Sequence, residues 1–289
     1  MEFLFSVFTP TYNRANTIGR TYEYLCKQTL RSFEWIIVDD GSTDNTEEIV
    51  QKWINTNKIS IVYLKQENGG KHRAFNRAVQ IAKGEIFICL DSDDYYIETA
   101  LEIIYSYHLI HKDNPWIAGF SCNSLDLHGN LIGTSLPVDE LVVSHYNLYN
   151  SLSVKGDKGL IYYTRILKEY PFPEFENEFF VTEALVLNRI SLRYKICCIK
   201  RSLEIKDYQR DGLSSKYRHL CLRNPNGYAL YINERNYFNL SFTNYVINAA
   251  SYVRYSLFAG KSFRNIYKEA INRRWTFIIA CFLGILLYI

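Results

Sequence analysis

The sequence contains no pair of cysteines at C-x-x-C spacing, and its seven cysteines are an odd number scattered between Cys26 and Cys281. This distribution does not suit a disulfide framework and is typical of a reducing compartment. The chain also begins without the basic and then apolar leader of a secretory signal, because Glu2 directly precedes the first apolar segment. We therefore expect a cytoplasmic protein.

The sequence has little net charge and no hydrophobic run long enough to cross a bilayer. A formal charge of +3 is too small to indicate a nucleic-acid partner. Residues 275–289 are almost wholly apolar but number only fifteen, whereas a membrane-spanning helix needs about 20. Six basic residues and one glutamate between residues 254 and 274 give a local charge of +5. The combination predicts a helix lying in a membrane interface; the alternative is a helix packed on the core or on another subunit.

Neither internal repeats nor low-complexity linkers divide the chain. Its 289 residues, 48% of them apolar, suit one large domain or one domain with an appendage. In the first part of the chain, short apolar runs alternate with helical patterns, which predicts a parallel sheet with right-handed crossovers. Strands are expected at residues 3–8, 34–38, 60–64 and 86–90, and helices at 17–30, after Asp44, at 73–83 and at 98–112.

Polar residues follow the first, second and fourth of these strands, and open sheets bind ligands at the carboxyl ends of their strands. The fourth strand runs into Asp91-Ser92-Asp93-Asp94, in which Asp91 and Asp93 point the same way on an extended chain. Clustered carboxylates resist desolvation unless something positive lies between them. A divalent cation with phosphate is the usual partner. The sequence favours such a site over a solvated loop that merely starts the next helix.

Short signals around the strands give further expectations. Pro10 should end the first strand, because proline is not tolerated inside a central strand. Asp44 and Glu47 have the spacing of a capping box. Glycines at 69–70 let the backbone approach a ligand closely, and Gly84 has the position of a helix C-cap.

The pattern changes after residue 115. We expect a hairpin formed by residues 117–127 and 131–136, and a strand at 159–163. A Pro- and Glu-rich loop is expected at 171–178, and helices are expected at 179–190 and 228–271. Glu183 lies in the first turns of the helix at 179–190. A carboxylate there either stabilises the helix N-terminus or performs chemistry, and the bare sequence leaves both readings open.

Four motifs in the first ~100 residues, and two weaker ones later, share the order and spacing of a known family. They are Thr9-Pro-Thr-Tyr-Asn-Arg14, Val38-Asp-Asp-Gly-Ser-Thr-Asp44, Asn68-Gly-Gly-Lys71 with Ala74, Asn76 and Ala78, Leu90-Asp-Ser-Asp-Asp94, then Phe172-Pro-Glu-Phe-Glu-Asn-Glu178 through Phe180-Val-Thr-Glu-Ala184, and Asp211-Gly-Leu-Ser214. The chain resembles the inverting glycosyltransferase family 2, of GT-A fold, in its bacterial polysaccharide-type members. The Gln-x-x-Arg-Trp motif of the processive branch is absent, which implies a single-addition transferase.

The resemblance implies a nucleotide-sugar donor, usually a UDP-sugar, and Mn²⁺ or Mg²⁺ as cofactor. Carried over by position, it implies that Asp40 contacts the nucleobase and that Pro10, Tyr12 and Arg14 line the nucleotide pocket, which Lys71 and Asn76 border. It implies that Asp91 and Ser92 lie near the ribose and metal and that Asp93 is a metal ligand. It implies Glu183 as the catalytic base, with Glu178 as its nearest rival. A divalent ion neutralises the departing diphosphate. One base without a protein nucleophile implies direct displacement and inversion. The implied acceptor is a saccharide hydroxyl, lipid-linked at the cytoplasmic membrane face, in surface or capsular polysaccharide synthesis.

The expected fold class is α/β, a Rossmann-like GT-A sheet, mixed but mainly parallel, flanked by helices and followed by a helical C-terminal extension. The expected domains are 1–220, with donor and acceptor halves 1–115 and 116–220, and 221–289, with its apolar tail at 275–289. Three alternatives stay open. A polysaccharide synthase is disfavoured by the missing Gln-x-x-Arg-Trp motif and by the single apolar segment. A sugar nucleotidyltransferase should carry a Gly- and Arg-rich loop after the first strand, yet no glycine precedes Gly19. A non-catalytic binding module should have lost one of the four acids Asp40, Asp91, Asp93 and Glu183, yet all are present.

Overall fold

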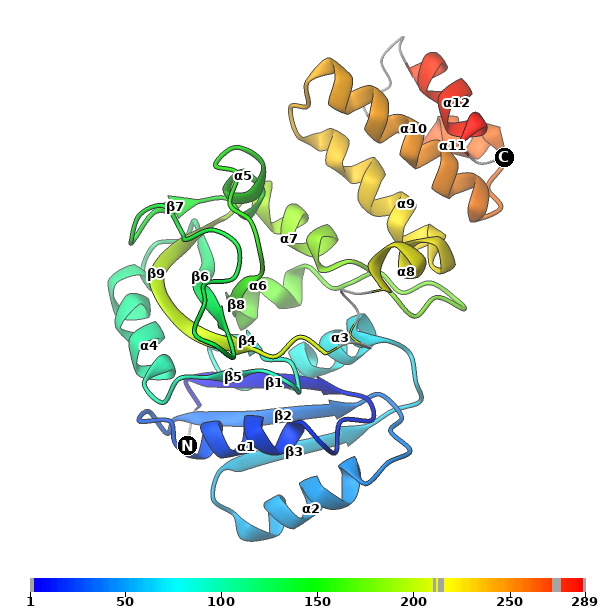
Figure 1. Cartoon of the computed structure of the whole chain (residues 1–289). Coiled ribbons are helices and arrows are strands. Elements are labelled where there is room, and N and C mark those ends of the chain that lie inside the picture. The colour runs from blue at the N-terminus through cyan, green and yellow to red at the C-terminus, as the bar shows by residue number, and fades with distance from the viewer. Residues whose placement is uncertain (1–2, 210–211, 213–215, 272–276, 288–289) are drawn as a thin grey trace. The chain divides into compact units, whose positions relative to one another are not determined.

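The computed structural model describes residues 3–209, 212, 216–271 and 277–287 (Figure 1). It divides into two compact units. Unit 1 comprises Met1–Pro171 and Arg189–Gln209, and unit 2 comprises Phe172–Asn188 and Arg210–Ile289. In this division residues 172–188 group with the C-terminal helices, and the assignment of donor, acceptor and C-terminal domains stays a prediction.

Unit 1 is built on a sheet that has nine strands within the described residues, in the order β3-β2-β1-β4-β8-β6-β9-β5, with β7 beside β9. Strands β1 (Phe5–Thr11), β2 (Phe33–Asp39), β3 (Ser60–Lys65) and β4 (Ile86–Cys89) are mutually parallel. Strand β8 (Lys158–Tyr163) runs antiparallel to β4 and to β6 (Ile117–Asp126). Strand β9 (Lys195–Lys206) is parallel to β6 and antiparallel to β5 (Tyr95–Tyr96) and β7 (Val142–Val143). The expected mixed α/β sheet is confirmed.

Helices cover both faces of the sheet. Their bounds are α1 (Ile18–Cys26), α2 (Thr46–Thr56), α3 (Lys71–Ile81), α4 (Ala100–His111), α5 (His145–Asn150) and α6 (Thr164–Glu169). Trp35 of β2 stacks with Tyr22 of α1 and Trp53 of α2, at centroid distances of 6.1 and 6.0 Å. Phe8 of β1 instead packs edge-on against Phe75 of α3 at 5.6 Å. Trp35 also donates to Thr9 Oγ1, and neighbouring residues of a strand face opposite ways, so α1 and α2 lie on one face and α3 on the other.

The expectation that Pro10 ends the first strand is wrong. Strand β1 continues through Pro10 to Thr11 and pairs with β2 along its full length. The Leu90 amide donates to the Phe8 carbonyl, so Phe8, and Pro10 two residues later, present their backbone groups to β4. The pairing of β1 with β4 ends at Phe8 and Cys89, so on this side Pro10 lies at an edge of the sheet, where proline is tolerated.

The capping box expected at Asp44 and Glu47 is also wrong. Helix α2 begins at Thr46, and its N-cap residue, Asn45, makes no side-chain cap hydrogen bond. Asp44 instead accepts from the Ala15 amide at 3.0 Å and from Thr46 Oγ1 at 2.6 Å. Glu47 forms an ion pair with Lys65 of β3 at 2.6 Å. Glu47 therefore joins α2 to β3, whereas Asp44 joins α2 to the loop after β1 and also accepts the Thr46 amide of α2 at 3.0 Å.

Gly84 does not cap a helix as expected. Helix α3 ends at Ile81 with Ala82 as its C-cap. A Cβ at Gly84 would lie 2.3 Å from the backbone of Phe5. The glycine is needed because the chain enters β4 directly against β1.

The expected hairpin forms only in part. Strand β6 ends at Asp126, and residues 131–136 contribute an isolated bridge between Leu125 and Leu131 rather than a strand. The Asp126 carboxylate accepts the amides of His128 and Asn130, both at 2.8 Å. This local turn takes the place of continued strand pairing.

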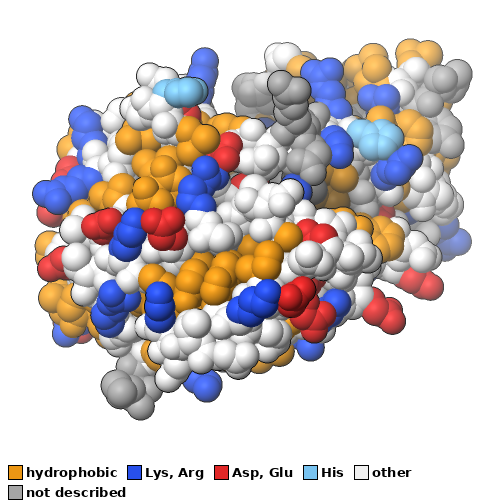
Figure 2. Space-filling view, turned by 60° about the horizontal axis from the view of Figure 1, so that its bottom comes forward, with side chains coloured by type: hydrophobic (Ala, Val, Ile, Leu, Met, Phe, Trp, Pro, Cys, Tyr) orange, Lys and Arg blue, Asp and Glu red, His pale blue; other side chains and the backbone are white. Residues whose placement is uncertain are grey.

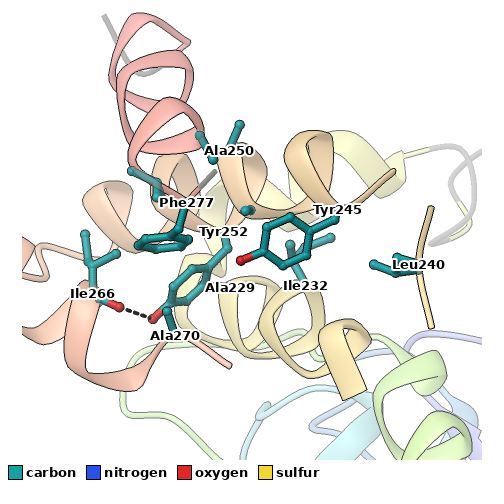
Figure 3. Close-up of a cluster of buried hydrophobic side chains, with 12 residues drawn as sticks. Ala229, Ile232, Leu240, Tyr245, Ala250, Tyr252, Ile266, Ala270 and Phe277 are labelled. Atoms are coloured by element: carbon teal, nitrogen blue, oxygen red, sulfur yellow. Dashed lines mark hydrogen bonds between the residues drawn. The ribbon is translucent and has the colours of Figure 1, made fainter. Parts of the chain in front are cut away.

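Unit 2 is helical, which confirms the expected helical C-terminal region. Its helices are the start of α7 (Glu183–Ser191), α8 (Tyr217–Arg223), α9 (Pro225–Glu234), the 3-10 helix η2 (Arg235–Tyr237), α10 (Phe242–Phe258), α11 (Phe263–Glu269) and α12 (Phe277–Leu286). Figure 3 shows its core, where Tyr252 from α10 donates to the Ile266 carbonyl of α11 at 3.2 Å. None of the described helices combines the length and apolarity that crossing a bilayer requires.

Candidate active site

The loops that follow β1 and β2 are bonded into one unit at the carboxyl edge of the sheet. Ser42 Oγ accepts the Asn13 amide at 2.9 Å, and Thr46 Oγ1 accepts the Arg14 amide at 3.2 Å. Asn13 returns a bond by accepting the Thr43 amide at 2.8 Å, and it adopts a left-handed φ of 52°. The backbone of Arg14 is thereby held by the neighbouring strand's loop.

Asp40 links the loop after β2 to the start of α3. Its Oδ1 accepts from Gln66 Nε2 at 2.7 Å and from the Gly69 amide at 2.8 Å, while Oδ2 accepts the Gly70 amide at 2.8 Å. Gly70 has a φ of 92°, which favours glycine. The carboxylate is buried, and it accepts three hydrogen bonds from its own chain. Since a carboxylate has about four acceptor sites, room remains for one further donor.

The preceding acid, Asp39, is fully buried and serves the fold. Its two oxygens accept the Ser42 amide and the Tyr63 hydroxyl, each at 2.6 Å. Burial and the charge of Asp39 raise the pKa of Tyr63, so this hydroxyl stays a donor. Of the two adjacent acids, only Asp40 reaches the loop before α3.

Asp91 pairs with Lys71, the first residue of α3. The Lys71 Nζ lies 2.6 Å from Asp91 Oδ1, and the two side chains are 21% and 36% exposed. Burial opposes ionisation of Asp91, but the charges of Lys71, Lys206 and Arg14 outweigh it and lower the pKa of the carboxyl. The structure thus places the charges of Arg14 and Lys71 beside Asp91, while their assignment to a site for nucleotide and metal stays a prediction.

Asp93 behaves differently from Asp91. Burial, followed by the charges of Asp91 and Asp94, raises the pKa of Asp93 to about 7, although Arg14 opposes the shift. No cation among the described residues forms an ion pair with its side chain. The carboxyl is therefore poorly compensated and would gain from a positive ligand.

The pair Asp91 and Asp93 fits a divalent cation in number and chemistry. The described residues contain no cluster of three or more His, Cys, Asp or Glu arranged to hold a metal. Mg²⁺ in nucleotide enzymes, however, is usually bound by only one or two carboxylates together with the substrate's phosphate oxygens. Two carboxylates beside Lys71 and Arg14 match that arrangement.

The third acid of the D-S-D-D loop (residues 91–94) has a partner that the sequence analysis missed. Lys206, at the end of β9, lies 3.0 Å from Asp94 Oδ2 and 3.3 Å from Glu204 Oε1. Burial raises the pKa of Asp94 and of Glu204, whereas the surrounding carboxylates raise the pKa of Lys206. One feature of the sequence indicated this cluster: the charged residues Glu204, Lys206 and Asp207, of alternating sign, follow a run of buried residues in β9.

The other predicted residues of this site lie near the same strand ends. Tyr12 follows β1 and is 48% exposed. Asn76 lies in the second turn of α3, and Ser92 is buried within the D-S-D-D loop. On the face of the molecule drawn in Figure 2, basic and acidic side chains are interspersed around a band of hydrophobic ones. That face shows no patch of a single charge.

The two candidate bases, Glu183 and Glu178, belong to unit 2 and have different environments there. Glu183 is partly exposed and is the first residue of α7, so the helix begins four residues later than the expected start at residue 179. Glu178 is buried. Its Oε1 accepts the Asn226 amide at 2.6 Å and the Asn226 side chain at 3.0 Å, and its Oε2 accepts the Gly227 amide at 2.9 Å. These residues open α9, so Glu178 caps that helix.

The segment around Glu178 is bonded to the same helix junction. Asn224 Oδ1 accepts the amides of Phe179 at 2.6 Å and Phe180 at 3.1 Å. Asn224 in turn donates to the Leu220 carbonyl of α8 at 2.7 Å. The predicted motif at 211–214 lies mostly outside the described residues.

The sheet has parallel strands with polar loops at their carboxyl edge, and the last of these strands, β4, runs into the D-S-D-D loop. An antiparallel strand extends the sheet beyond β4. These features define an α/β domain of the GT-A class. Residues 6–125 match the family model of glycosyl transferase family 2. The chain resembles this family in that region, which confirms the predicted resemblance.

The similar curated proteins are bacterial. Glycosyltransferase GlyG of Streptococcus pneumoniae is 35% identical over 149 residues, which are 50% of this chain and 48% of that protein. The chondroitin synthase of Pasteurella multocida is 37% identical over 130 residues, 45% of this chain and 13% of that protein. The poly(ribitol-phosphate) β-N-acetylglucosaminyltransferase TarS of Staphylococcus aureus is 32% identical over 200 residues, 65% of this chain and 34% of that protein. The chain thus spans less than half the length of each of these relatives.

Solved structures show the same fold. TarS residues 1–349 in complex with UDP-GlcNAc align with a TM-score of 0.63 and 20% identity, covering 98% of this chain and 89% of that one. The mannosyltransferase PcManGT from Pyrobaculum calidifontis, in complex with GDP-Man and Mn²⁺, aligns with a TM-score of 0.56 and 16% identity, covering 98% and 84%. At these identities the likeness establishes the GT-A fold.

Proposed function

We propose that this protein transfers a sugar, with inversion, from a nucleotide-sugar to a hydroxyl group of a saccharide acceptor in the synthesis of a bacterial surface or capsular polysaccharide. The observation that carries the proposal is the grouping of Arg14, Lys71, Asp91 and Asp93 at the carboxyl edge of the parallel strands. Two cations suit a diphosphate, and two carboxylates suit a divalent ion. The related TarS structure contains UDP-GlcNAc, which supports a UDP-sugar as donor.

The donor site proposed here needs Mn²⁺ or Mg²⁺, held by Asp93 and Asp91. A bound divalent ion neutralises negative charge that develops on the departing diphosphate. Lys71 and Arg14 supply fixed positive charge beside it. The PcManGT structure is a complex with Mn²⁺, and this supports the same requirement in the present chain.

The nucleotide is assigned to the loops after β1 and β2 and to the start of α3. The remaining acceptor site of Asp40 suits the imide N–H of uracil. The exposed ring of Tyr12, with Pro10 and Arg14, would line the nucleotide pocket, and Asn76 and Ser92 are proposed at its border.

Glu183 is proposed as the base that takes the proton of the acceptor hydroxyl. Its rival Glu178 is buried and already accepts three hydrogen bonds at the start of α9. A carboxylate engaged in this way is a poor proton acceptor. Glu183 is partly exposed at the start of α7, which favours it for the chemical step.

A lipid-linked acceptor would place the enzyme on the cytoplasmic face of the membrane, and unit 2 has a surface that suits this. Helix α12 buries Phe277, Ala280 and Gly284, and a Cβ at Gly284 would lie 2.7 Å from the Ala250 carbonyl of α10. The opposite side of α12 leaves Ile278, Phe282 and Leu286 exposed at 63%, 66% and 70%. We call these three residues the outer stripe of α12.

Neighbouring α11 adds aromatic and basic side chains. Phe263 and Tyr267, one turn apart, are 50% and 56% exposed. Arg264 and Lys268, also one turn apart, are exposed and form no ion pair within the described part of the chain. Exposed apolar, aromatic and basic side chains together suit an anionic lipid surface, where each basic residue contributes roughly 1 kcal/mol.

The test of the proposed function is the substitution Asp93→Asn. UDP release would be measured with a panel of UDP-sugars and a saccharide acceptor, with and without Mn²⁺. We expect metal-dependent turnover in the parent and in the control Asp113→Asn, which changes an exposed aspartate. Asp93→Asn should lose metal-dependent turnover while unfolding at the parent's temperature. Turnover within a few-fold of the parent would overturn the metal assignment.

A further inference from the structure

The D-S-D-D loop is held from one side by α1. Arg20 Nη2 donates to the Asp93 carbonyl at 2.7 Å and to the Asp207 carboxylate at 2.6 Å. Thr21 Oγ1 donates to the Asp94 carbonyl at 2.8 Å. Two successive residues of α1 therefore bind the backbone of two successive residues of the loop.

The end of β9 holds the same loop through the Asp94 side chain. One oxygen of Asp94 binds Lys206, and the other accepts the Asp207 amide at 2.9 Å. Lys206 also binds Glu204, which accepts from Ser124 Oγ at 2.7 Å. The side chains of Lys206, Asp94 and Glu204 are only 13%, 6% and 2% exposed. This network is therefore part of the interior of unit 1.

The three acids of the loop are consequently not equivalent. The two oxygens of Asp94 are engaged by Lys206 at the end of β9 and by the Asp207 amide that follows it, whereas the partner of Asp91 is Lys71 of α3. The Asp94 amide closes the loop on itself by donating to the Asp91 carbonyl at 3.1 Å. A displacement of Asp94 therefore also displaces Asp91 and Asp93.

We infer that Lys206 is a positioning residue for the donor site, acting through Asp94, and that Asp94 is an anchor of the loop rather than a metal ligand. This inference rests on the proposed function, because it assigns the loop to the nucleotide and its divalent ion. Lys206 fixes where Asp91 and Asp93 stand, and its positive charge lowers the pKa of Asp91. Small displacements of such groups cost far more in function than in folding.

Lysine is specifically suited to this position. Its ammonium group is a compact charge with three donors, which here serve two carboxylates, Asp94 in the D-S-D-D loop and Glu204 in β9. Arginine keeps the charge but presents a longer, planar fork. Lys206→Arg should therefore displace Asp94 without leaving a buried carboxylate unpaired. Lys195→Arg, at the exposed start of the same strand, is the matched control.

The test compares the full-length parent, Lys206→Arg and Lys195→Arg in two measurements. Calorimetric titration with UDP, with and without Mn²⁺, gives the gain in affinity that the metal provides. Hydrogen exchange reports on residues 90–97, which include the Asp94 amide. We expect Lys206→Arg to lose at least about tenfold of the metal-dependent gain, to bind UDP alone nearly as the parent does, and to exchange faster in the loop. Lys195→Arg should match the parent.

A second variant guards against a folding defect at position 206. Asp94→Asn keeps the size of the side chain, but an amide offers only one acceptor oxygen to both Lys206 and the Asp207 amide. Its unfolding temperature should fall, because one buried donor loses its acceptor, but at a temperature where the variant is fully folded it should reproduce both effects of Lys206→Arg.

The outcomes separate this inference from the proposed function. If the parent gains no UDP affinity from Mn²⁺, the proposed metal site fails, and the exchange of residues 90–97 alone decides whether Lys206 holds the loop. If the parent shows the gain and both variants retain it, the inference is overturned, whatever the exchange shows. Loss of the gain without faster exchange would also overturn it, because the loop would then be held equally well without Lys206.

Discussion

The buried cap that Glu178 places on α9 leads to a prediction whose size follows from the contacts. Glu178→Gln keeps the length and shape of the side chain but replaces one carboxylate oxygen with the NH2 group of an amide, which donates hydrogen bonds and cannot accept them. If the remaining oxygen faces Asn226, two hydrogen bonds survive and the Gly227 amide faces a second donor. The opposite orientation loses two bonds. The cheaper orientation therefore leaves one buried amide unsatisfied.

The expected destabilisation combines two terms. An unsatisfied buried donor costs about 1–3 kcal/mol. Loss of a negative charge at a helix N-terminus costs about 0.3–1 kcal/mol, and somewhat more where the site is buried. We therefore expect Glu178→Gln to lower the free energy of unfolding by about 2–4 kcal/mol.

Urea unfolding followed by circular dichroism measures this loss. Glu176→Gln is the matched control, because it makes the same chemical change at an exposed position two residues away. If Glu178→Gln is as stable as Glu176→Gln, the capping role is refuted. Should Glu178→Gln then also prove inactive, the role of base would move five residues upstream from Glu183.

Three further predictions concern catalysis, the base contact and the membrane. Glu183→Gln should bind the donor as the parent does but transfer the sugar about 100-fold more slowly or worse, and normal transfer to the true acceptor would exclude Glu183 as base. Asp40→Asn should weaken UDP binding by about 1–3 kcal/mol. It should also lower the unfolding temperature, because the amide cannot accept from Gln66 and both glycine amides. An unchanged dissociation constant in titration calorimetry would rule out the contact between Asp40 and the nucleobase. Replacing both Phe282 and Leu286 by serine should abolish flotation with anionic liposomes at low salt. The unfolding temperature should not change, since both side chains are exposed. A parent protein that does not float with such liposomes would contradict the membrane assignment.

Local sequence patterns predicted much of the donor half correctly. Short apolar runs and amphipathic segments placed β1 to β4 and the intervening helices to within a few residues, because strand and helix periodicities are local properties. The D-S-D-D loop was also recognisable, since two acids two residues apart directly follow a buried strand. Residues 195–206, in contrast, were given no strand, although they form β9, which pairs with β5, β6 and β7.

Local rules failed where their outcome depends on a neighbour in space. Pro10 fits inside β1 because the pairing of β1 with β4 ends two residues earlier, at Phe8. Gly84 looked like a helix cap, yet its role is to let the chain pass close to Phe5. Glu178 and Glu183 both looked like candidate bases, and only the contact of Glu178 with residues 48 and 49 positions later in the chain separates their roles.

The sequence by itself determined the kind of chemistry at the carboxyl edge: carboxylates after β2 and β4, and Gly69-Gly70-Lys71 at the start of α3. Only the tertiary structure decided which acid does what. Asp40 became the acceptor for the glycine amides, Asp91 the partner of Lys71, and Asp94 the partner of Lys206, 112 residues away. The physical reason is that a carboxylate's role depends on which donors and cations surround it, and those arrive through strand order and register, which no local pattern encodes.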